Sequence, residues 1–339
     1  MDFSSDNWSG ATAAVMDGLA RANAERFAPA YGNDAVTEAA KRRFCEIFER
    51  EVEVLFVSSG TAANTLSMAA VRREAGFVLC TEEAHVHNDE YNATEFFTGM
   101  KLVPVATRDG RMDPAGLRAG LARFPEGRSG RPAVLTLTNA TENGTVYAPA
   151  EIAALSAVAK ERGLPVHIDG ARFANAVAAS GASPADLTWR AGADLMSFGG
   201  TKNGCVAAEA VIIFDPGRFP DLATLRQRAG QGLSKQRFIA GQYLGYFAEE
   251  GWLATAGQAN AMAAKLAAGL GRSNRVRFDW ESTANELFPV LDNDLAGQLR
   301  AGGARFHTWQ DLPDGQQRIR LVTSWSTTDA DVDAFLALL

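Results

Sequence analysis

The sequence is poor in cysteine and histidine, which excludes several kinds of site. Its 339 residues include only three cysteines, Cys45, Cys80 and Cys205, at wide and irregular spacing. An odd number of cysteines so far apart indicates neither a disulfide framework nor a zinc cluster, so we expect buried free thiols. Of the four histidines, His85 and His87 are the closest pair, and residues two apart do not share a helix face. The sequence therefore predicts no metal site.

Long hydrophobic runs and an excess of positive charge are absent too. No stretch approaches the roughly 18 apolar residues of a membrane-spanning helix. The first ten residues, MDFSSDNWSG, have neither the basic nor the apolar part of a secretion signal. With 33 basic against 40 acidic residues the net charge is −7, which argues against nucleic acid or an anionic membrane as partner. We expect a soluble cytoplasmic protein that acts on small molecules.

Short apolar runs alternate with helical segments over the first 215 residues or so. The runs are VEVLFV (52–57), GFVLC (76–80), KLVPVA (101–106), AVLTLT (133–138), PVHID (165–169), DLMSF (194–198) and EAVIIF (209–214). Runs this short and apolar are typical of strands covered on both faces. Their alternation with helices predicts an α/β fold with a mainly parallel sheet.

The last third of the chain has a different pattern. A helical stretch over 235–270 is too long for one ordinary helix, and we expect it to break near Gly251. Short strand-like and helical segments follow it and predict a small α+β domain. We therefore divide the chain into an N-terminal arm (1–30), a large domain (31–245), and a linker helix with a small C-terminal domain (246–339).

The residues after each apolar run are the candidate site residues, because ligands of open α/β sheets bind beyond the carboxyl ends of the strands. Ser59, Gly60 and Thr61 follow the first run and open a helix. Free backbone N–H groups at a helix N-terminus suit a phosphate, although a serine there is more often a simple helix cap. The stretch is neither a P-loop nor a dinucleotide fingerprint, because the required lysine and glycines are missing.

Asp169 ends the fifth run, and Arg172 follows it. A carboxylate at the end of an apolar strand is costly to bury unless a partner compensates its charge. The two side chains can form an internal ion pair. Alternatively, Asp169 holds a cationic group of a ligand and Arg172 an anionic one.

A lysine follows the sixth run in an unusual setting. Lys202 lies in the glycine-flanked stretch SFGGTKNG (197–204). Small neighbours let the backbone turn sharply and give the amine room to move, which a surface lysine does not need. His85 follows the second run, where it is either a site residue or a histidine that caps a helix.

The combination is more specific than its parts. A phosphate cradle, a strand-end aspartate and a glycine-flanked lysine follow one another in this order, as they do in pyridoxal phosphate enzymes of the aspartate aminotransferase fold. Lys202 would bind the cofactor as a Schiff base. Asp169 would keep the pyridine nitrogen protonated, so that the ring can accept the electrons of a carbanion.

Several stretches together resemble the low-specificity L-threonine aldolase family. They are DFSSDN, YGND, SGTAAN, EAH, HIDGARFANA, SFGGTKNG and RIRLVTSW, and they span the chain. KRRFCEIFE, TNATENGTVY and TKNG are similar to the bacterial branch that includes L-phenylserine aldolase. The resemblance implies a type I pyridoxal phosphate fold, with a large domain and a small C-terminal one. It also implies cleavage of a β-hydroxy-α-amino acid into glycine and an aldehyde.

Transferred by position, the resemblance gives roles to individual residues. Lys202 becomes the Schiff-base lysine and Asp169 the partner of the pyridine nitrogen. His85 would lie over the ring, and Gly60 and Thr61 would bind the phosphate beside Ser59.

The remaining residue roles that the resemblance implies concern the substrate and the neighbouring subunit. Ser5, Arg172 and Arg320 would hold the substrate carboxylate or nearby oxygens. Many family members have a histidine near the position where this chain has Thr141 and Glu142, which leaves the base for the β-hydroxyl open. His85 could serve as this catalytic base, directly or through water. Either Lys235 or Arg237 would be the cation that reaches the phosphate of a neighbouring subunit. The family implies a homodimer or homotetramer with sites near the subunit interface.

Other functions remain open on these residues. Transamination and β-elimination use the same fold and cofactor. An inactive relative that only binds the cofactor would not need Lys202, Asp169 and Arg320 together. A nicotinamide dehydrogenase lacks support, because its glycine fingerprint is absent.

Overall fold

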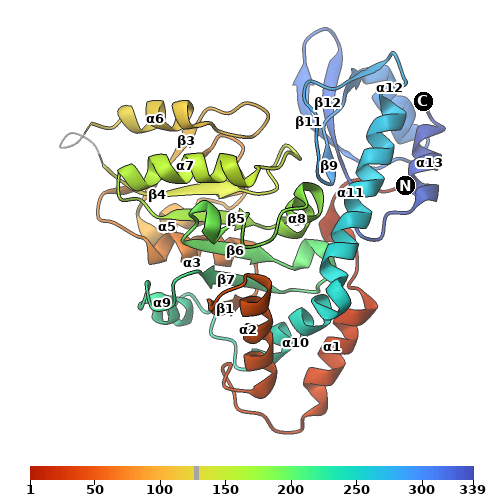
Figure 1. Cartoon of the computed structure of the whole chain (residues 1–339). Coiled ribbons are helices and arrows are strands. Elements are labelled where there is room, and N and C mark those ends of the chain that lie inside the picture. The colour runs from red at the N-terminus through yellow and green to blue at the C-terminus, as the bar shows by residue number, and fades with distance from the viewer. Residues whose placement is uncertain (126–129) are drawn as a thin grey trace.

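The computed structural model describes residues 1–125 and 130–339, and its large domain is built on a seven-stranded sheet of order β1-β7-β6-β5-β4-β2-β3 (Figure 1). The strands are β1 (Glu53–Val57), β2 (Gly76–Thr81), β3 (Lys101–Val105), β4 (Arg131–Thr138), β5 (Val166–Gly170), β6 (Leu195–Gly199) and β7 (Glu209–Ile213). Only β7 is antiparallel to its neighbours, β1 and β6. The predicted mainly parallel sheet is therefore confirmed.

Helices cover both faces of this sheet (Figure 1). The helices from the N-terminus to Tyr246 are α1 (Ala13–Ala24), α2 (Ala35–Ile47), α3 (Gly60–Ala70), α4 (His85–Asn88), α5 (Ala93–Thr98), α6 (Pro114–Ala122), α7 (Pro149–Glu161), α8 (Phe173–Ser180), α9 (Leu222–Arg228) and α10 (Arg237–Tyr246), of which α1 packs on α10. Alternate residues of β1 face opposite layers: Val54 and Phe56 pack with α2 and α10, whereas Leu55 and Val57 pack with α3 and α9. Strands buried on both faces explain why each run is apolar throughout.

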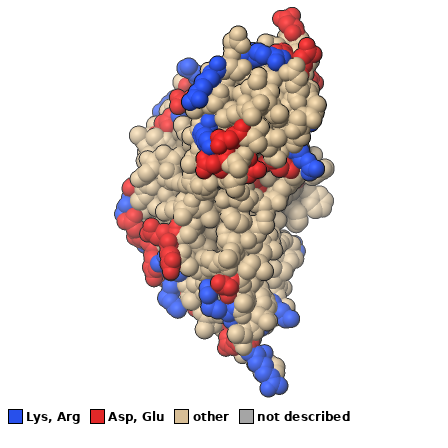
Figure 2. All heavy atoms as spheres, turned by 90° about the vertical axis from the view of Figure 1, so that its right-hand side faces the viewer, with Lys and Arg blue, Asp and Glu red and all other residues tan. Residues whose placement is uncertain are grey.

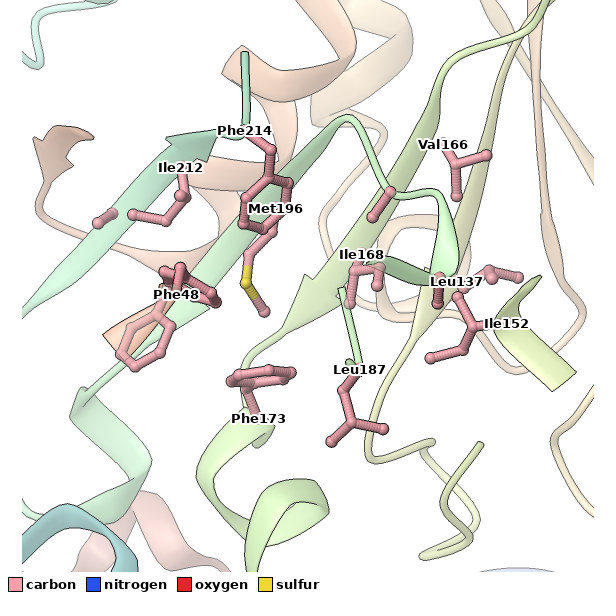
Figure 3. Close-up of a cluster of buried hydrophobic side chains, with 14 of the residues drawn as sticks. Phe48, Leu137, Ile152, Val166, Ile168, Phe173, Leu187, Met196, Ile212 and Phe214 are labelled. Carbon is pink, nitrogen blue, oxygen red and sulfur yellow. The ribbon is translucent and has the colours of Figure 1, made fainter. Parts of the chain in front are cut away.

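The largest hydrophobic cluster of the described residues lies on the α2, α6, α7, α8 and α10 side of the sheet. Figure 3 shows part of it, where Phe173 of α8 lies near Met196 of β6 and Ile168 of β5. These side chains hold the ends of β5 and β6 in fixed positions, and the site residues follow those ends.

The long helical stretch breaks as expected. α10 ends at Tyr246, and α11 (Gly251–Leu270) begins after a turn in which Glu249 and Glu250 have φ of 50° and 55°. Helix α1 packs closely on α10, since a Cβ on Gly18 would lie 2.1 Å from the carbonyl oxygen of Gly241. Helix α11 runs on to the small domain (Figure 1).

The small domain has a second, antiparallel sheet. Its strands are β8 (Val276–Arg277), β9 (Glu286–Leu287), β10 (Val290–Asp292), β11 (His307–Leu312) and β12 (Gln316–Val322), with helices α12 (Asn293–Ala301) and α13 (Asp329–Leu336). The first residues of the chain also belong here. The N–H of Phe3 donates to Arg305 O at 2.9 Å, the Phe3 carbonyl accepts from Val322 N at 2.8 Å, and its ring is buried in this core. The segment 1–30 thus contacts both domains, because α1 packs on α10.

The surface carries charges of both signs. On the face in Figure 2, lysine and arginine side chains alternate with acidic ones, and much of the middle is uncharged. In residues 1–125 and 130–339, no helix is long and apolar enough to cross a membrane, and no cluster of three or more His, Cys, Asp or Glu residues is arranged to hold a metal ion.

Candidate active site

The ends of β5 and β6 bring Asp169 and the Lys202 turn together. The two strands are parallel neighbours, and Asp169 pairs with Ser197 in the ladder. A Cβ on Gly199 would lie 2.6 Å from the carbonyl oxygen of Ala171, so only glycine lets β6 pass this close to the turn after β5. Gly204 has φ of 105°, in the left-handed region that favours glycine, and ends the turn that carries Lys202. The glycines therefore position the lysine beside the aspartate.

One cavity collects most of the residues singled out in the sequence. Its lining includes Ser59, Gly60, Thr61, His85, Asp169 and Lys202. It also includes residues that the sequence did not indicate, namely Asn7, Ser58, Asn64, Glu90, Ala171, Thr201 and Glu209. The cavity thus lies where the carboxyl ends of β1, β2, β5 and β6 lead into their turns.

Ser59 and Gly60 form the start of α3 at one side of this cavity. The Ser59 hydroxyl accepts from Ala62 N at 3.2 Å, so the serine does act as a helix cap. A Cβ on Gly60 would meet only Glu209 Oε2, at 3.8 Å, which shows that the cavity is open beside this helix start. Free N–H groups and the positive end of the helix dipole suit an anion here.

A chain of hydrogen bonds fixes Asp169 and His85. Asp169 is 3% exposed and accepts from Ala171 N at 3.0 Å and from Asn64 Nδ2 at 2.8 Å. Asn64 Nδ2 also donates to Glu90 Oε1 at 2.8 Å, and the same oxygen lies 2.8 Å from His85 Nδ1. His85 is therefore not a helix cap, because its ring bonds Glu90. This bond raises the pKa of His85 above its usual value, although burial opposes it.

Glu142 lies next to His85, whereas Thr141 does not. Glu142 Oε1 accepts from His85 N at 2.7 Å and from the Thr138 hydroxyl at 3.1 Å. Its Oε2 is buried without a hydrogen-bond partner in the described part of the chain. Burial, and then the charge of Asp169, raise the pKa of Glu142 to about 7. The hydroxyl of Thr141 bonds that of Thr145 at 2.8 Å and so belongs to the local turn.

Arg172 does not pair with Asp169, so the interpretation of these two residues as an internal ion pair is wrong. Arg172 Nε and Nη2 donate to the Asp6 carboxylate at 2.7 and 3.0 Å, and Nη1 lies 2.9 Å from Glu286 Oε2. Asp169 is held by neutral donors instead. Burial alone raises the pKa of Asp6, but Arg172 and then Lys202 hold it below its usual value. This cluster of Arg172, Asp6 and Glu286 therefore lies near the cavity.

Arg320 of β12 joins the same cluster, and Ser5 does not. Arg320 Nη1 lies 4.0 Å from Glu286 Oε1, and Nη2 donates to Ser4 O at 3.3 Å. Its Nε is buried without a partner among the described residues, so the guanidinium has donor capacity left. The Ser5 hydroxyl accepts from Asn7 N at 3.1 Å and lines a separate hollow.

Neither cation expected to reach a neighbouring subunit lines the cavity of its own chain. Lys235 is exposed. Arg237 Nε donates to Ala22 O at 3.1 Å, which ties α10 to α1. Their role towards another subunit stays a prediction.

The residues present fit pyridoxal phosphate. The start of α3 offers unpaired N–H groups to a phosphate, and the missing Cβ of Gly60 leaves room for it. The buried Asp169 carboxylate has neutral donors and no Lys or Arg within ion-pair distance among the described residues, so it can pair with a protonated ring nitrogen. Lys202 supplies the amine in the same cavity.

Comparisons with known proteins agree with this fit. Residues 2–292 match the family described as beta-eliminating lyase. The chain is 41% identical to the low specificity L-threonine aldolase of Pseudomonas aeruginosa, over 96% of this chain and 93% of that one. It is 38% identical to the enzyme of the same name from a Pseudomonas species, over 97% and 94%.

Solved structures give the same answer. Leishmania major threonine aldolase is similar with a TM-score of 0.94 and 30% identity, covering 99% of this chain and 98% of that one. Sphingomonas wittichii serine palmitoyltransferase shares the fold alone, with a TM-score of 0.72 and 14% identity, covering 100% and 86%. The chain therefore belongs to the β-eliminating lyase family of pyridoxal phosphate enzymes with the type I fold.

Proposed function

We propose that this chain is a pyridoxal phosphate-dependent aldolase that cleaves L-threonine and related β-hydroxy-α-amino acids into glycine and an aldehyde. The observation that carries the proposal is the meeting of Lys202, Asp169 and His85 at one cavity, with Glu142 hydrogen-bonded to the backbone N–H of His85. The similarity of the whole chain to proteins named low specificity L-threonine aldolase supports it.

The cavity residues would hold the cofactor at three points. Lys202 would bind its aldehyde carbon, the start of α3 its phosphate, and Asp169 its ring nitrogen. When bound, pyridoxal phosphate supplies a conjugated ring that accepts the electron pair left at Cα. The charge of Asp169 would keep a proton on the ring nitrogen, and Asn64 and Ala171 keep the Asp169 carboxylate in place.

The substrate carboxylate would bind at the cluster of Arg172 and Arg320. A guanidinium can hold a carboxylate through two parallel hydrogen bonds, which fixes its orientation as well as its position. Fixing the carboxylate would also fix which bond at Cα is presented to the chemistry that the cofactor supplies, and so would select the reaction. Arg320 has the unpaired Nε, whereas Asp6 and Glu286 already occupy Arg172. Arg320 is therefore the stronger ligand for the carboxylate.

Glu142 is the proton acceptor that we assign to the β-hydroxyl. With a pKa of about 7, Glu142 is ionised in a large fraction of the molecules at neutral pH, so it can accept a proton. Its protonated form can then give the proton back to the product or to water. Its Oε2 has no partner in the described chain, and its Oε1 is anchored on His85 N. Glu142 takes the hydroxyl proton, directly or through water, as the Cα–Cβ bond breaks.

Two finer features of the function are also proposals. L-Phenylserine is accepted as a substrate, since the TNATENGTVY stretch that contains Glu142 resembles the branch with L-phenylserine aldolase. The protein forms a homodimer or homotetramer that covers an exposed aromatic patch of Tyr91, Phe96 and Phe97, directly after the cavity residue Glu90. Light scattering on a sizing column tests the second point, and a monomer would contradict it.

Product analysis tests the main proposal. L-Threonine and L-phenylserine, offered separately without any 2-oxo acid, are expected to give glycine with acetaldehyde or benzaldehyde. L-Alanine is expected to give no product, because it has no β-oxygen that can become a carbonyl. Ammonia and a 2-oxo acid as main products would indicate β-elimination, and amino transfer to added pyruvate would indicate transamination.

A further inference from the structure

Glu209 is a cavity residue to which neither the sequence patterns nor the proposed reaction gives a role. It opens β7, and its ladder partners are Val57 at the end of β1 and Gly199 at the end of β6. The residue therefore lies between the turn that leads to Gly60 and the turn that carries Lys202. Its side chain is 6% exposed and lines the cavity.

The carboxyl group of Glu209 faces the start of α3. Its Oε2 lies 3.8 Å from the position that a Cβ on Gly60 would take. Its Oε1 accepts a long hydrogen bond of 3.4 Å from Thr201 N. An anion that binds the free N–H groups of Gly60 and Thr61 therefore comes to lie against this carboxyl group.

No arginine or lysine of the described residues forms an ion pair with Glu209. Burial is the largest effect on the pKa of Glu209 and raises it to about 7. The charge of Lys202 lowers this pKa, and the charge of Asp169 raises it. Burial and then the charge of Glu209 raise the pKa values of Cys205 and Tyr243, so both of these side chains stay uncharged. The free protein therefore holds this carboxyl close to the balance between acid and anion near neutral pH.

A phosphate ester is mostly a dianion at neutral pH, since its second pKa is about 6. A dianion and a carboxylate in contact repel strongly in a buried site, and a proton between them turns the repulsion into a short charge-assisted hydrogen bond. We propose that Glu209 binds the cofactor phosphate as a neutral carboxylic acid, donating a hydrogen bond from its O–H to a phosphate oxygen. The proton comes from solvent when the anionic form of the free protein binds the cofactor.

This inference rests on the cofactor and not on the aldol reaction, so the test measures binding to the protein freed of cofactor. Pyridoxamine 5′-phosphate is the probe, because it has no aldehyde and cannot bond to Lys202. Pyridoxamine, which lacks the phosphate, is the matched ligand. Dissociation constants are measured between pH 6.5 and 9, and proton uptake is measured by calorimetry in buffers of different ionisation enthalpy.

When the wild-type protein binds pyridoxamine 5′-phosphate at pH 8, it is expected to take up close to one proton per site. When it binds pyridoxamine, this proton uptake is expected to be absent. Its dissociation constant is expected to rise about tenfold per pH unit above pH 7, where the anion of Glu209 predominates. The glutamine in Glu209→Gln provides an N–H donor that cannot be ionised. The dissociation constant of this variant for pyridoxamine 5′-phosphate is therefore expected to lie within about threefold of the wild-type value at pH 7, and its proton uptake is expected to be lost. Glu209→Ala is expected to bind about tenfold more weakly, as for one lost hydrogen bond.

Glu82→Gln is the control, because Glu82 is exposed and does not line the cavity. If Glu209→Gln weakens binding as much as Glu209→Ala does, the side chain does not donate a hydrogen bond to the phosphate and the inference is wrong. If Glu209→Gln and Glu209→Ala bind pyridoxamine 5′-phosphate more tightly than the wild type does, Glu209 is a repelling anion and the inference is wrong as well. The inference also fails if the wild-type protein takes up no proton specific to the phosphate, a result that needs no variant and so decides the matter even if the variants do not fold. Neither failure affects the aldolase proposal, which product analysis tests.

Discussion

Replacing Asp169 by asparagine removes one negative charge and almost no volume. The carboxylate is held by Ala171 N and by Asn64 Nδ2, both hydrogen-bond donors. The new amide can accept from one of them with its oxygen, and its NH2 group then faces the other donor. Asn64 Oδ1 is buried and unpartnered in the described chain, so Asn64 can turn its amide over to accept from the new NH2 group. Its Nδ2 then loses its bond to Glu90.

The expected effects differ for folding and for catalysis. One lost or mismatched hydrogen bond lowers the free energy of unfolding by about 1–3 kcal/mol, which a protein of this size tolerates. Catalysis loses the charge that keeps the ring nitrogen protonated. A loss of about 3 kcal/mol or more of transition-state stabilisation corresponds to a fall in kcat of at least about 100-fold.

The assay compares kcat on L-threonine with the amount of cofactor bound, read from its absorbance above the protein band. Asp169→Asn is expected to retain the cofactor and to lose turnover. Asp17→Asn is the control, since Asp17 is an exposed residue of α1. A kcat near that of the wild type at full cofactor occupancy would refute the assignment of Asp169 to the ring nitrogen.

Two other substitutions separate substrate binding from proton transfer. Arg320→Ala is expected to raise KM for L-threonine by about 10- to 150-fold, from the roughly 1.5–3 kcal/mol of a hydrogen bond to a charged group, while the exposed control Arg305→Ala leaves it unchanged. An unchanged KM in Arg320→Ala would assign the carboxylate to Arg172. In the wild type, kcat is expected to fall as the pH drops below about 7, because protonation removes the base form of Glu142. Glu142→Gln is expected to lower kcat and to abolish this ionisation, and a retained ionisation near pH 7 would locate the base elsewhere.

The sequence predicted the sheet well because its strands are buried on both faces. Each apolar run became a strand, and neighbouring parallel strands carry their carboxyl-end turns to one edge. That rule alone brought together Gly60, Asp169 and Lys202. The direction of β7 was beyond reach, since an apolar run has the same composition in a parallel and an antiparallel neighbour.

Side chains that meet only through the tertiary fold were missed or misjudged. Asn64 was within reach, because it lies one helical turn after Gly60 and so on the same face of α3. Glu90 belongs to a turn with no recognisable pattern. The ion-pair partners of Arg172 are Asp6 and Glu286, which lie far from it in the sequence on opposite sides. No local sequence pattern indicates such contacts. Phe3 enters the small domain for the same reason, through hydrogen bonds to Arg305 and Val322.

Covalent trapping of the cofactor tests the central claim most directly, namely that the cavity at the ends of β5 and β6 is the active site. Borohydride reduction of the holoenzyme is expected to fix pyridoxal phosphate to one lysine, which peptide mapping identifies as Lys202. The same treatment of Lys202→Ala is expected to leave the protein unlabelled. A label on any other lysine of the wild-type protein would contradict the account.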